Sequence, residues 1–148
     1  PESATVFLDP KKSFINFNQC DIITPNLNEL KQISGYNIIS EKDIKESCKI
    51  ILNKYNLKYI IAKRGDEGIT IVGNNDYVKH LKAKFVETPD VTGAGDTVIS
   101  SISLAFAVTN DIEKSAEFAI NASALAVSKP GTATVTIDEI NNYINANE

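Results

Sequence analysis

Residues 90–97 combine groups that can bind a phosphoryl group and accept a proton during its transfer. The small residues Gly93, Ala94 and Gly95 stand directly before Asp96, where a strongly apolar stretch begins. Small residues let the backbone approach a ligand closely, and the first amides of a helix lack internal partners. These amides favour an anion, and Asp96 can take a proton from an attacking hydroxyl while they hold the charge that develops. A glycine-rich turn with Asp96 as a helix cap is the alternative interpretation.

This segment differs from two common glycine-rich motifs. A Walker loop requires Gly-Lys followed by Ser or Thr, and that sequence is absent here. A dinucleotide-binding fingerprint requires a third glycine where this chain has Val98. Both kinds of site are therefore excluded at residues 90–97.

A second candidate group is Asn26 with Glu29, which are three residues apart and face one side of a helix start. An amide and a carboxylate there can hold hydrated Mg²⁺, which usually keeps several waters. A helix cap followed by a favourable first-turn acid is the alternative.

Two further segments can contact a nucleotide. The turn at residues 63–68 places Lys63 or Arg64 near phosphates, unless it is only a solvated hairpin turn. The small residues at 119–124 would let a flat adenine approach a helix, with Asn121 as a polar contact. The alternative for these alanines is tight packing of the helix on a sheet.

Composition limits the class of protein. The 148 residues are 43% hydrophobic and 23% charged, which is typical of a globular domain, and the net charge of -4 argues against a nucleic-acid partner. Two distant cysteines and one histidine argue against a zinc site of Cys/His type and fit a reducing, cytoplasmic compartment. No apolar run reaches the roughly 20 residues that a membrane span needs.

The order of predicted elements indicates an α/β fold. Strands alternate with helices in the first third, which favours parallel pairing, and a hairpin-like meander follows. We expect a mixed sheet with helices on both faces, in one domain covering residues 1–148. The predicted strands are 4–8, 22–23, 59–62, 69–72, 77–81 and 84–86, and the predicted helices are 26–33, 41–55, 95–108, 112–128 and one from about 137 with Thr136 as its cap.

These four segments, in this order, resemble the ribokinase-like (PfkB) carbohydrate kinases over essentially the whole chain. Residues 90–97 are similar to that family's C-terminal signature, and residues 26–29 to its NxxE motif. The resemblance implies a three-layer α/β/α, Rossmann-like fold with a mainly parallel sheet. It also implies ATP and Mg²⁺ as cofactors and a sugar or sugar-phosphate acceptor.

The resemblance also implies a role for each candidate residue. Asp96 is implied as the base and the amides of Gly93, Ala94 and Gly95 as the anion hole. Asn26 and Glu29 would organise phosphate and Mg²⁺, with Glu29 acting through water. The residues implied to line the nucleotide are Gly65, Gly68, Asn121 and Gly131, whereas Lys63 stands where relatives more often carry a small hydroxyl residue.

Three segments, 9–11, 23–26 and 129–133, look most like the family members that phosphorylate D-glycero-D-manno-heptose 7-phosphate for ADP-heptose and lipopolysaccharide core synthesis. Family kinases are about twice this length, so the chain is expected to be the C-terminal half of the fold. Relatives often form dimers through a lid that the chain lacks. A homodimer is therefore compatible with a full-length protein that has the lid. A nucleotide-binding fragment that is inactive alone, and a kinase for another sugar or a nucleoside, remain the alternatives.

Overall fold

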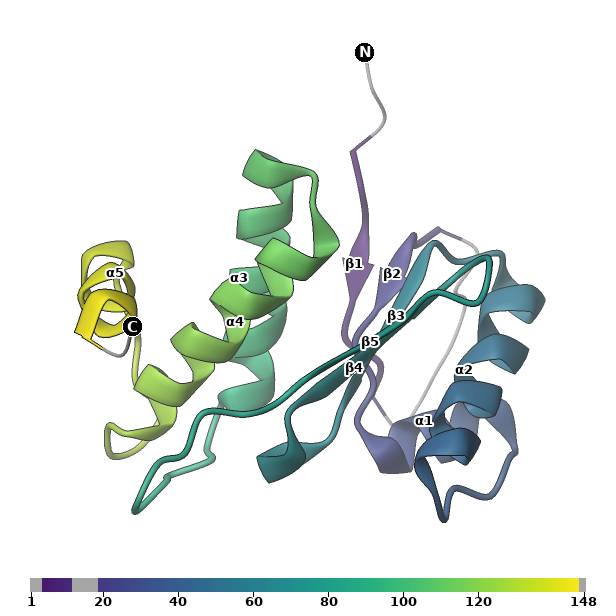
Figure 1. Ribbon diagram of the computed structural model, residues 1–148, viewed down its shortest axis with the longest axis horizontal. Coiled ribbons are helices and arrows are strands. Elements are labelled where there is room, and N and C mark those ends of the chain that lie inside the picture. The colour runs from purple at the N-terminus through teal and green to yellow at the C-terminus, as the bar shows by residue number, and fades with distance from the viewer. Residues whose placement is uncertain (1–3, 12–18, 147–148) are drawn as a thin grey trace. The chain divides into compact units, whose positions relative to one another are not determined.

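The computed structural model describes residues 4–11 and 19–146, which fall into two compact units divided between Leu81 and Lys82. The first unit contains strands β1 (Phe7–Leu8), β2 (Ile22–Ile23), β3 (Tyr59–Lys63), β4 (Ile69–Gly73) and β5 (Val78–Leu81), with helices α1 (Leu27–Ser34) and α2 (Glu41–Tyr55) and the 3₁₀ turn η1 (Gly65–Glu67). The second contains helices α3 (Ala94–Thr109), α4 (Ile112–Val127) and α5 (Ile137–Ala146) (Figure 1).

The five strands of the first unit form one mixed sheet in the order β1-β2-β3-β4-β5. β1, β2 and β3 pair in parallel, with Ile22 opposite both Phe7 and Tyr59. β3, β4 and β5 then pair antiparallel as a meander. Because β1–β3 are parallel, their carboxyl ends meet at one edge of the sheet, which is where ligands bind in open α/β sheets.

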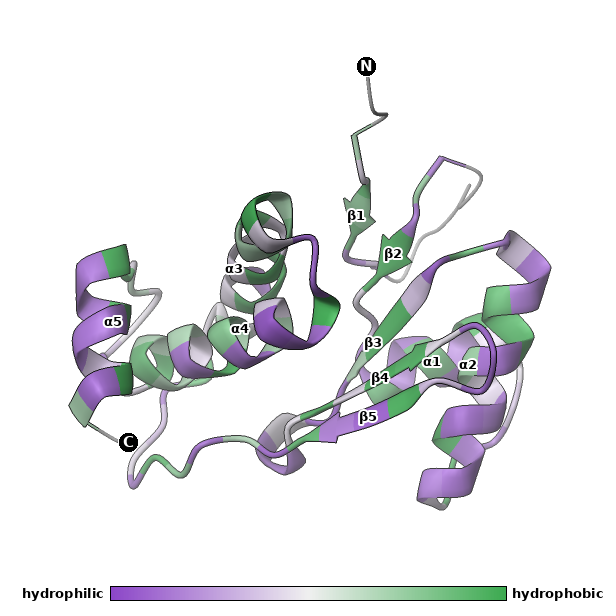
Figure 2. Cartoon of the chain, turned by 45° about the horizontal axis from the view of Figure 1, so that its top comes forward, coloured by the Kyte–Doolittle hydropathy of each residue, from purple (hydrophilic) through white to green (hydrophobic). Residues whose placement is uncertain are grey.

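Helices α1 and α2 begin at reciprocal capping boxes. Asn26 accepts from the Glu29 N–H, and the Glu29 carboxylate accepts from the Asn26 N–H. Ser40 and Asp43 make the same exchange at α2. Each box satisfies two amides that a helix start would otherwise leave unpaired, and Figure 2 shows hydrophobic and hydrophilic residues alternating along α2, as expected for a helix with one buried face.

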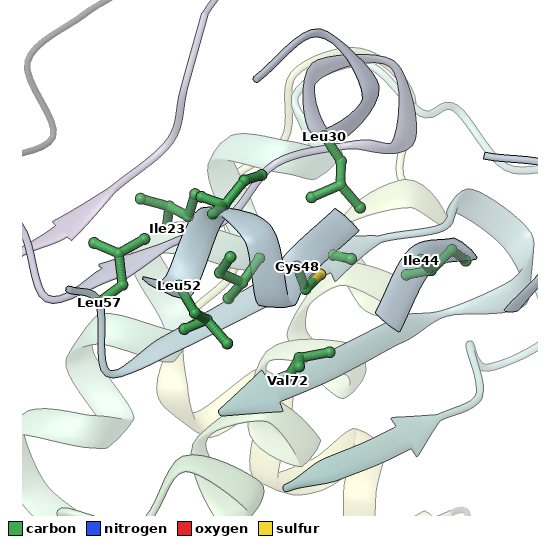
Figure 3. Packing of buried hydrophobic residues seen from close by; sticks show 10 residues of the cluster. Ile23, Leu30, Ile44, Cys48, Leu52, Leu57 and Val72 are labelled. Carbon is green, nitrogen blue, oxygen red and sulfur yellow. The ribbon is translucent and has the colours of Figure 1, made fainter. Parts of the chain in front are cut away.

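The core of the first unit lies between these two helices and the sheet (Figure 3). Leu30 from α1 and Cys48 from α2 are fully buried, as are Ile23 and Ile60 from the strands. Val72 of β4 completes this layer and is also fully buried. The core therefore fixes α1, and with it the capping box, against the parallel part of the sheet.

In the second unit, α3 and α4 pack along each other and α5 contacts α4. Alanines keep α4 narrow: Ala116, Ala119 and Ala122 are fully buried. Thr136 caps α5 through a bond from the Glu139 N–H to its hydroxyl, as predicted. None of the helices in the described part of the chain is long and apolar enough to cross a membrane.

Two predicted strands differ from the structure. The strand expected at residues 4–8 is limited to Phe7 and Leu8. The strand expected at residues 84–86 is wrong, since no strand follows Leu81 among the described residues. Leu81 pairs with Ile69, which is the first residue of β4. The residues after Leu81 therefore have no residue of β4 opposite them.

Candidate functional site

Asp90 organises the turn that leads into α3. Its carboxylate accepts from the Thr92 N–H at 3.1 Å and from the Gly131 N–H at 2.7 Å. Its own N–H donates to the carbonyl of Val127 at the end of α4. The Thr92 hydroxyl and the two amides lower the pKa of Asp90 below its usual value, because each of them stabilises the carboxylate.

Gly93 is the residue before α3 and has φ of +77°. A side chain in this left-handed conformation is strained. Space is also limited, because a Cβ on Gly93 would lie 3.1 Å from the Thr132 methyl group. The glycine thus permits both the turn into α3 and the close approach of the loop at 129–135.

Two of the three predicted anion-hole amides are open. The N–H groups of Gly93 and Gly95 donate to no residue in the described ranges 4–11 and 19–146. The Ala94 N–H instead donates to the Val91 carbonyl at 3.2 Å. An anion can therefore bind at Gly93 and Gly95 directly, whereas at Ala94 it must replace a turn hydrogen bond.

Asp96 lies in the first turn of α3 and is exposed. It lines a pocket of about 450 Å³ that lies wholly within the second unit. Gly93 and Thr97 line the same pocket. The Asp96 carboxylate and Gly93, which carries an open amide, therefore line one concavity.

The rest of this pocket is mainly apolar. Leu104 of α3 and Phe118 of α4 line it together with Ile137 and Ile140 of α5, and residues 132–135 form the remaining wall. Asn121, predicted as a polar contact for adenine, is not among the lining residues, and its amide donates to the Glu117 carbonyl of its own helix. Phe118, one turn earlier, was missed because an aromatic residue at helical spacing is usually core.

Lys129 fixes the loop that forms the pocket wall. Its ammonium donates to the Thr134 carbonyl at 3.1 Å and to the Glu139 carboxylate at 2.7 Å. Gly131, predicted to border the nucleotide, has φ of +71° and carries the amide that Asp90 holds. The loop is thus anchored to α5 at one end and to the turn before α3 at the other.

In the first unit, the structure brings Asn26 and Glu29 together, as the spacing predicted. Their bonds of 2.9 Å and 2.7 Å form the capping box, which was the structural alternative. One Glu29 oxygen is used in this box. The other makes no bond that the described residues account for, and a single carboxylate suits Mg²⁺ that keeps its waters.

A charged network that no sequence motif indicated surrounds Asp9 at the carboxyl edge of the parallel strands. Asp9 follows β1 and accepts from Lys63 at 2.5 Å, Lys11 at 2.9 Å and the Thr24 hydroxyl at 3.0 Å. Burial alone would raise the pKa of Asp9, but Lys63, Lys11 and Thr24 lower it below the usual value. The signal in the sequence is a carboxylate and a lysine that each end a strand meeting at this edge.

Two predicted phosphate contacts, Lys63 and Arg64, are already paired with carboxylates in the structure. Lys63 is paired with Asp9, so a phosphate would compete with a carboxylate for it. The Arg64 side chain is only 7% exposed and is held by Glu41 and Glu67. These pairs give Arg64 a structural role, because they tie η1 to α2, and the side chain is not solvated as the hairpin-turn alternative requires.

The turn after Lys63 depends on its two glycines. Gly65 has φ of +64° and Gly68 has φ of +97° with ψ of -134°, a conformation that only glycine adopts readily. The Gly68 N–H donates to the Gly65 carbonyl at 3.1 Å. The glycines are therefore required by the turn itself, whatever lies beside it.

A comparison with known protein families decides the identity of the fold. The profile of the pfkB family carbohydrate kinases matches residues 3–139. The chain belongs to the pfkB family. Among curated relatives, this pfkB chain is 35% identical to the bifunctional protein HldE of Blochmanniella floridana and 33% identical to that of Salmonella arizonae, each over 94% of the chain and 29% of the relative.

Solved structures show the same fold. The ribokinases of Arabidopsis thaliana and Thermotoga maritima match 95% of the pfkB chain with TM-scores of 0.85 and 0.82, at 21% and 23% identity and over 47% and 49% of their own lengths. A putative ribokinase II from Escherichia coli, in complex with ATP and Mg²⁺, matches 88% of the chain with a TM-score of 0.72, at 26% identity over 41% of its length. The fold is the ribokinase-like α/β fold, and the chain spans less than half of these proteins.

Proposed function

We propose that this pfkB chain is the nucleotide-binding and catalytic part of an ATP-dependent sugar kinase. The observation that carries the proposal is the shared pocket of Asp96 and Gly93 at the start of α3. Family membership supports the reaction class, and the E. coli neighbour with bound ATP supports the nucleotide.

We assign a task to each group at the start of α3. Asp96 takes the proton of the acceptor hydroxyl as its oxygen bonds to the γ-phosphorus, and the bond from that phosphorus to the bridging oxygen breaks to release ADP. The open amides of Gly93 and Gly95 stabilise the negative charge on the transferred group. The positive end of the α3 dipole strengthens this effect.

The apolar part of the pocket suits the nucleotide base. Leu104, Phe118 and Ile140 supply flat or branched apolar surface, which is the usual lining of a base or cofactor pocket. The other predicted nucleotide contacts are Asn121, Lys63, Arg64, Gly65 and Gly68. Lys63 and Arg64 would have to break their ion pairs with carboxylates before they could bind a phosphate.

Glu29 is the residue we propose to hold Mg²⁺ through water. The metal would supply charge neutralisation on the phosphates of the nucleotide. Glu29 itself would contribute one oxygen, since the other caps α1. In the described ranges, no group of three or more His, Cys, Asp or Glu side chains is placed to hold a metal ion.

For the acceptor we propose D-glycero-D-manno-heptose 7-phosphate, in cytoplasmic ADP-heptose and lipopolysaccharide core synthesis. The support is the resemblance of residues 9–11, 23–26 and 129–133 to heptose-phosphate kinases, together with the HldE relatives. The second candidate, a nucleotide-binding module that transfers nothing alone, is favoured by the 29% share of those relatives that the chain spans.

The first test replaces the proposed base in the gene product that contains this chain. Asp96→Asn should lower kcat at least roughly a hundredfold, because a general base contributes on the order of 10² to 10⁴. ATP affinity should change little, since the amides remain. Asp138→Asn is the matched control, because Asp138 also occupies the first turn of a helix but does not line the pocket. Near-normal turnover of Asp96→Asn would exclude the proposed base.

The second test separates the acceptor from the module hypothesis. Phosphoryl transfer is measured with heptose 7-phosphate, ribose, fructose 6-phosphate and adenosine, using the chain alone and the gene product that contains it. The heptose should give the highest kcat/KM in the full gene product. A preference for adenosine would contradict the acceptor, and ATP binding without transfer by either protein would favour the module.

A further inference from the structure

The pocket that Asp96 lines lacks the side chains that distinguish one nucleobase from another. Apart from Asp96, which we assign to the acceptor hydroxyl, the polar side chains that line it in the described ranges are all hydroxyls. These hydroxyls belong to Thr97, Ser100, Ser101, Thr132 and Thr134. Among the described lining residues there is no Asn or Gln amide, which offers a donor and an acceptor at fixed positions, and no Lys or Arg.

A hydroxyl does not tell an amino group from a carbonyl, because it donates one hydrogen bond, accepts others and rotates to suit its partner. The purine ring carries an amino group in adenine where guanine and hypoxanthine carry a carbonyl. Two of the hydroxyls also have partners within α3: Thr97 donates to the Gly93 carbonyl at 3.3 Å and Ser100 to the Asp96 carbonyl at 2.7 Å. The hydroxyls of the pocket therefore set no preference between these bases.

Two further groups, in the elements that form the pocket, are engaged elsewhere. The Asn121 amide donates to the Glu117 carbonyl of its own helix at 2.9 Å, and Asn121 does not line the pocket. The Thr134 carbonyl accepts from the Lys129 ammonium at 3.1 Å. What remains for a base is mainly apolar surface, which responds to the size and shape of a ring rather than to the polar groups on its edge.

The rim of the pocket is open to water. Leu104 and Ile137 line the pocket and are 53% and 57% exposed. A polar base group that finds no partner in the protein stays hydrated at such a rim, and an unpaired polar group is costly only when it is buried. The site therefore lacks the penalty by which hydrogen-bonding sites reject a wrong ligand by on the order of 10⁴ to 10⁵.

We propose that this site binds purine nucleoside triphosphates as a class, with the base lying on the Phe118 ring, and does not select ATP through its base. The inference rests on the proposed function, because it concerns the part of the phosphoryl donor beyond the phosphates. Phe118 of α4 is the one aromatic residue among the described residues that line the pocket. Stacking on an aromatic ring tolerates any base, since every base has a π-face.

The experiment compares ligands that differ in the base alone. Calorimetry measures the binding of the Mg²⁺ complexes of ATP, ITP, GTP, CTP and tripolyphosphate to the full gene product. ATP, ITP and GTP should bind within about a hundredfold of one another, which is the discrimination that an apolar pocket achieves. CTP should bind more weakly than all three, because its smaller ring covers less apolar surface. Tripolyphosphate, which has no base, should bind most weakly.

Phe118→Leu tests the stacking residue. Leucine is apolar but lacks the flat ring, so the affinities for ATP, ITP and GTP should each fall about tenfold, whereas the affinity for tripolyphosphate should not change. Phe106→Leu is the matched control, because Phe106 is also half-buried, on α3, but does not line the pocket. Melting temperatures show whether either variant has lost stability, and the comparison of nucleotides in the unaltered protein depends on neither variant.

The outcomes separate this inference from the proposed function. A preference for ATP over ITP and GTP above about a hundredfold would overturn the inference while ATP binding stands. Loss of such a preference in Asn121→Ala would give Asn121 the adenine contact predicted for it. Equal affinities for ATP and tripolyphosphate, or unchanged affinities in Phe118→Leu, would also overturn the inference, because the base would then not lie on Phe118.

Failure of all four nucleotides to bind would contradict the proposed function and the inference with it. Similar affinities for the three purine nucleotides, lowered alike by Phe118→Leu and not by Phe106→Leu, support the inference.

Discussion

At the scale of single residues, the Asp9–Lys63 pair is the contact with the clearest consequence for stability. Both side chains are largely buried, with exposed fractions of 9% and 15%. A charge left in such a place without its partner is costly, whereas the intact pair alone contributes little. The pair therefore matters mainly because a variant that lacks one partner keeps the other charge buried and unpaired, which lowers its stability.

Asp9→Asn should lower the free energy of unfolding by about 2 kcal/mol near pH 7, because it leaves the Lys63 ammonium without its carboxylate. The pKa of Asp9 is lowered by folding, so its contribution is present above the usual value of 3.8 and is lost as pH falls through the folded value. Urea unfolding at pH 7 and at pH 3 should show a large difference between variant and parent at pH 7 and a smaller one at pH 3.

Asp76→Asn provides the control for this measurement. Asp76 pairs with Lys45 and Lys49 at an exposed turn, with 72% of its side chain accessible. Asparagine also tolerates the left-handed backbone that Asp76 adopts. A stability loss at Asp76 equal to that at Asp9, or a loss at Asp9 that does not depend on pH, would contradict this account of the pair.

At the scale of elements, alanine should lower the stability of the chain more at Gly93, which precedes α3, than at Gly35, which follows α1. Gly93→Ala and Gly35→Ala each place a side chain at positive φ, which costs roughly 1–2 kcal/mol. Only Gly93 has a neighbour, the Thr132 methyl group, whereas nothing lies within 4 Å at Gly35. Thermal unfolding should therefore show the larger loss for Gly93→Ala, and ATP affinity should fall for that variant alone.

The two capping boxes allow a test of the NxxE motif. Asn26→Ala and Ser40→Ala should each destabilise the chain by about 1 kcal/mol, since each removes an N-cap acceptor. If Asn26 and Glu29 also organise Mg²⁺, only Asn26→Ala should weaken binding of the Mg²⁺ complex of ATP. Equal ATP affinities in the two variants would leave the motif with a structural role only.

The helices could be predicted from the sequence because their signals are local. Ser40, Thr136 and Gly35 mark helix ends through side chains or backbone conformations that belong to the element itself. The strands depend on partners elsewhere in the chain. Residues 84–86 have suitable side chains but pair with no strand in the described ranges 4–11 and 19–146, and Phe85 is 89% exposed.

The same distinction explains which parts of the site could be predicted. Residues 90–97 carry a local pattern, and Asp96 and Gly93 line the same pocket in the structure. Asp9, Phe118 and the role of Asp90 in holding Gly131 depend on contacts between distant residues. No spacing rule along the chain reveals such contacts, so they emerge only from the fold.

At the scale of the whole molecule, ligand binding should stabilise the chain by linkage. A ligand at about a hundred times its dissociation constant adds about 2.7 kcal/mol when it binds only the folded state. ATP should therefore raise the melting temperature in proportion to the logarithm of its concentration. An Asp96→Asn chain should show the same rise, since its amides and apolar pocket are unchanged.

The central claim is that the phosphates bind at the start of α3 beside Asp96. It is tested most directly by titrating the isotope-labelled chain with the Mg²⁺ complex of ATP and following its backbone amides by NMR. The account predicts that the amides of Gly93 and Gly95 shift most and saturate together with those of the pocket-lining residues. Unmoved amides at Gly93 and Gly95, with the largest shifts at the first unit's surface around Tyr59 and Tyr77, would contradict it.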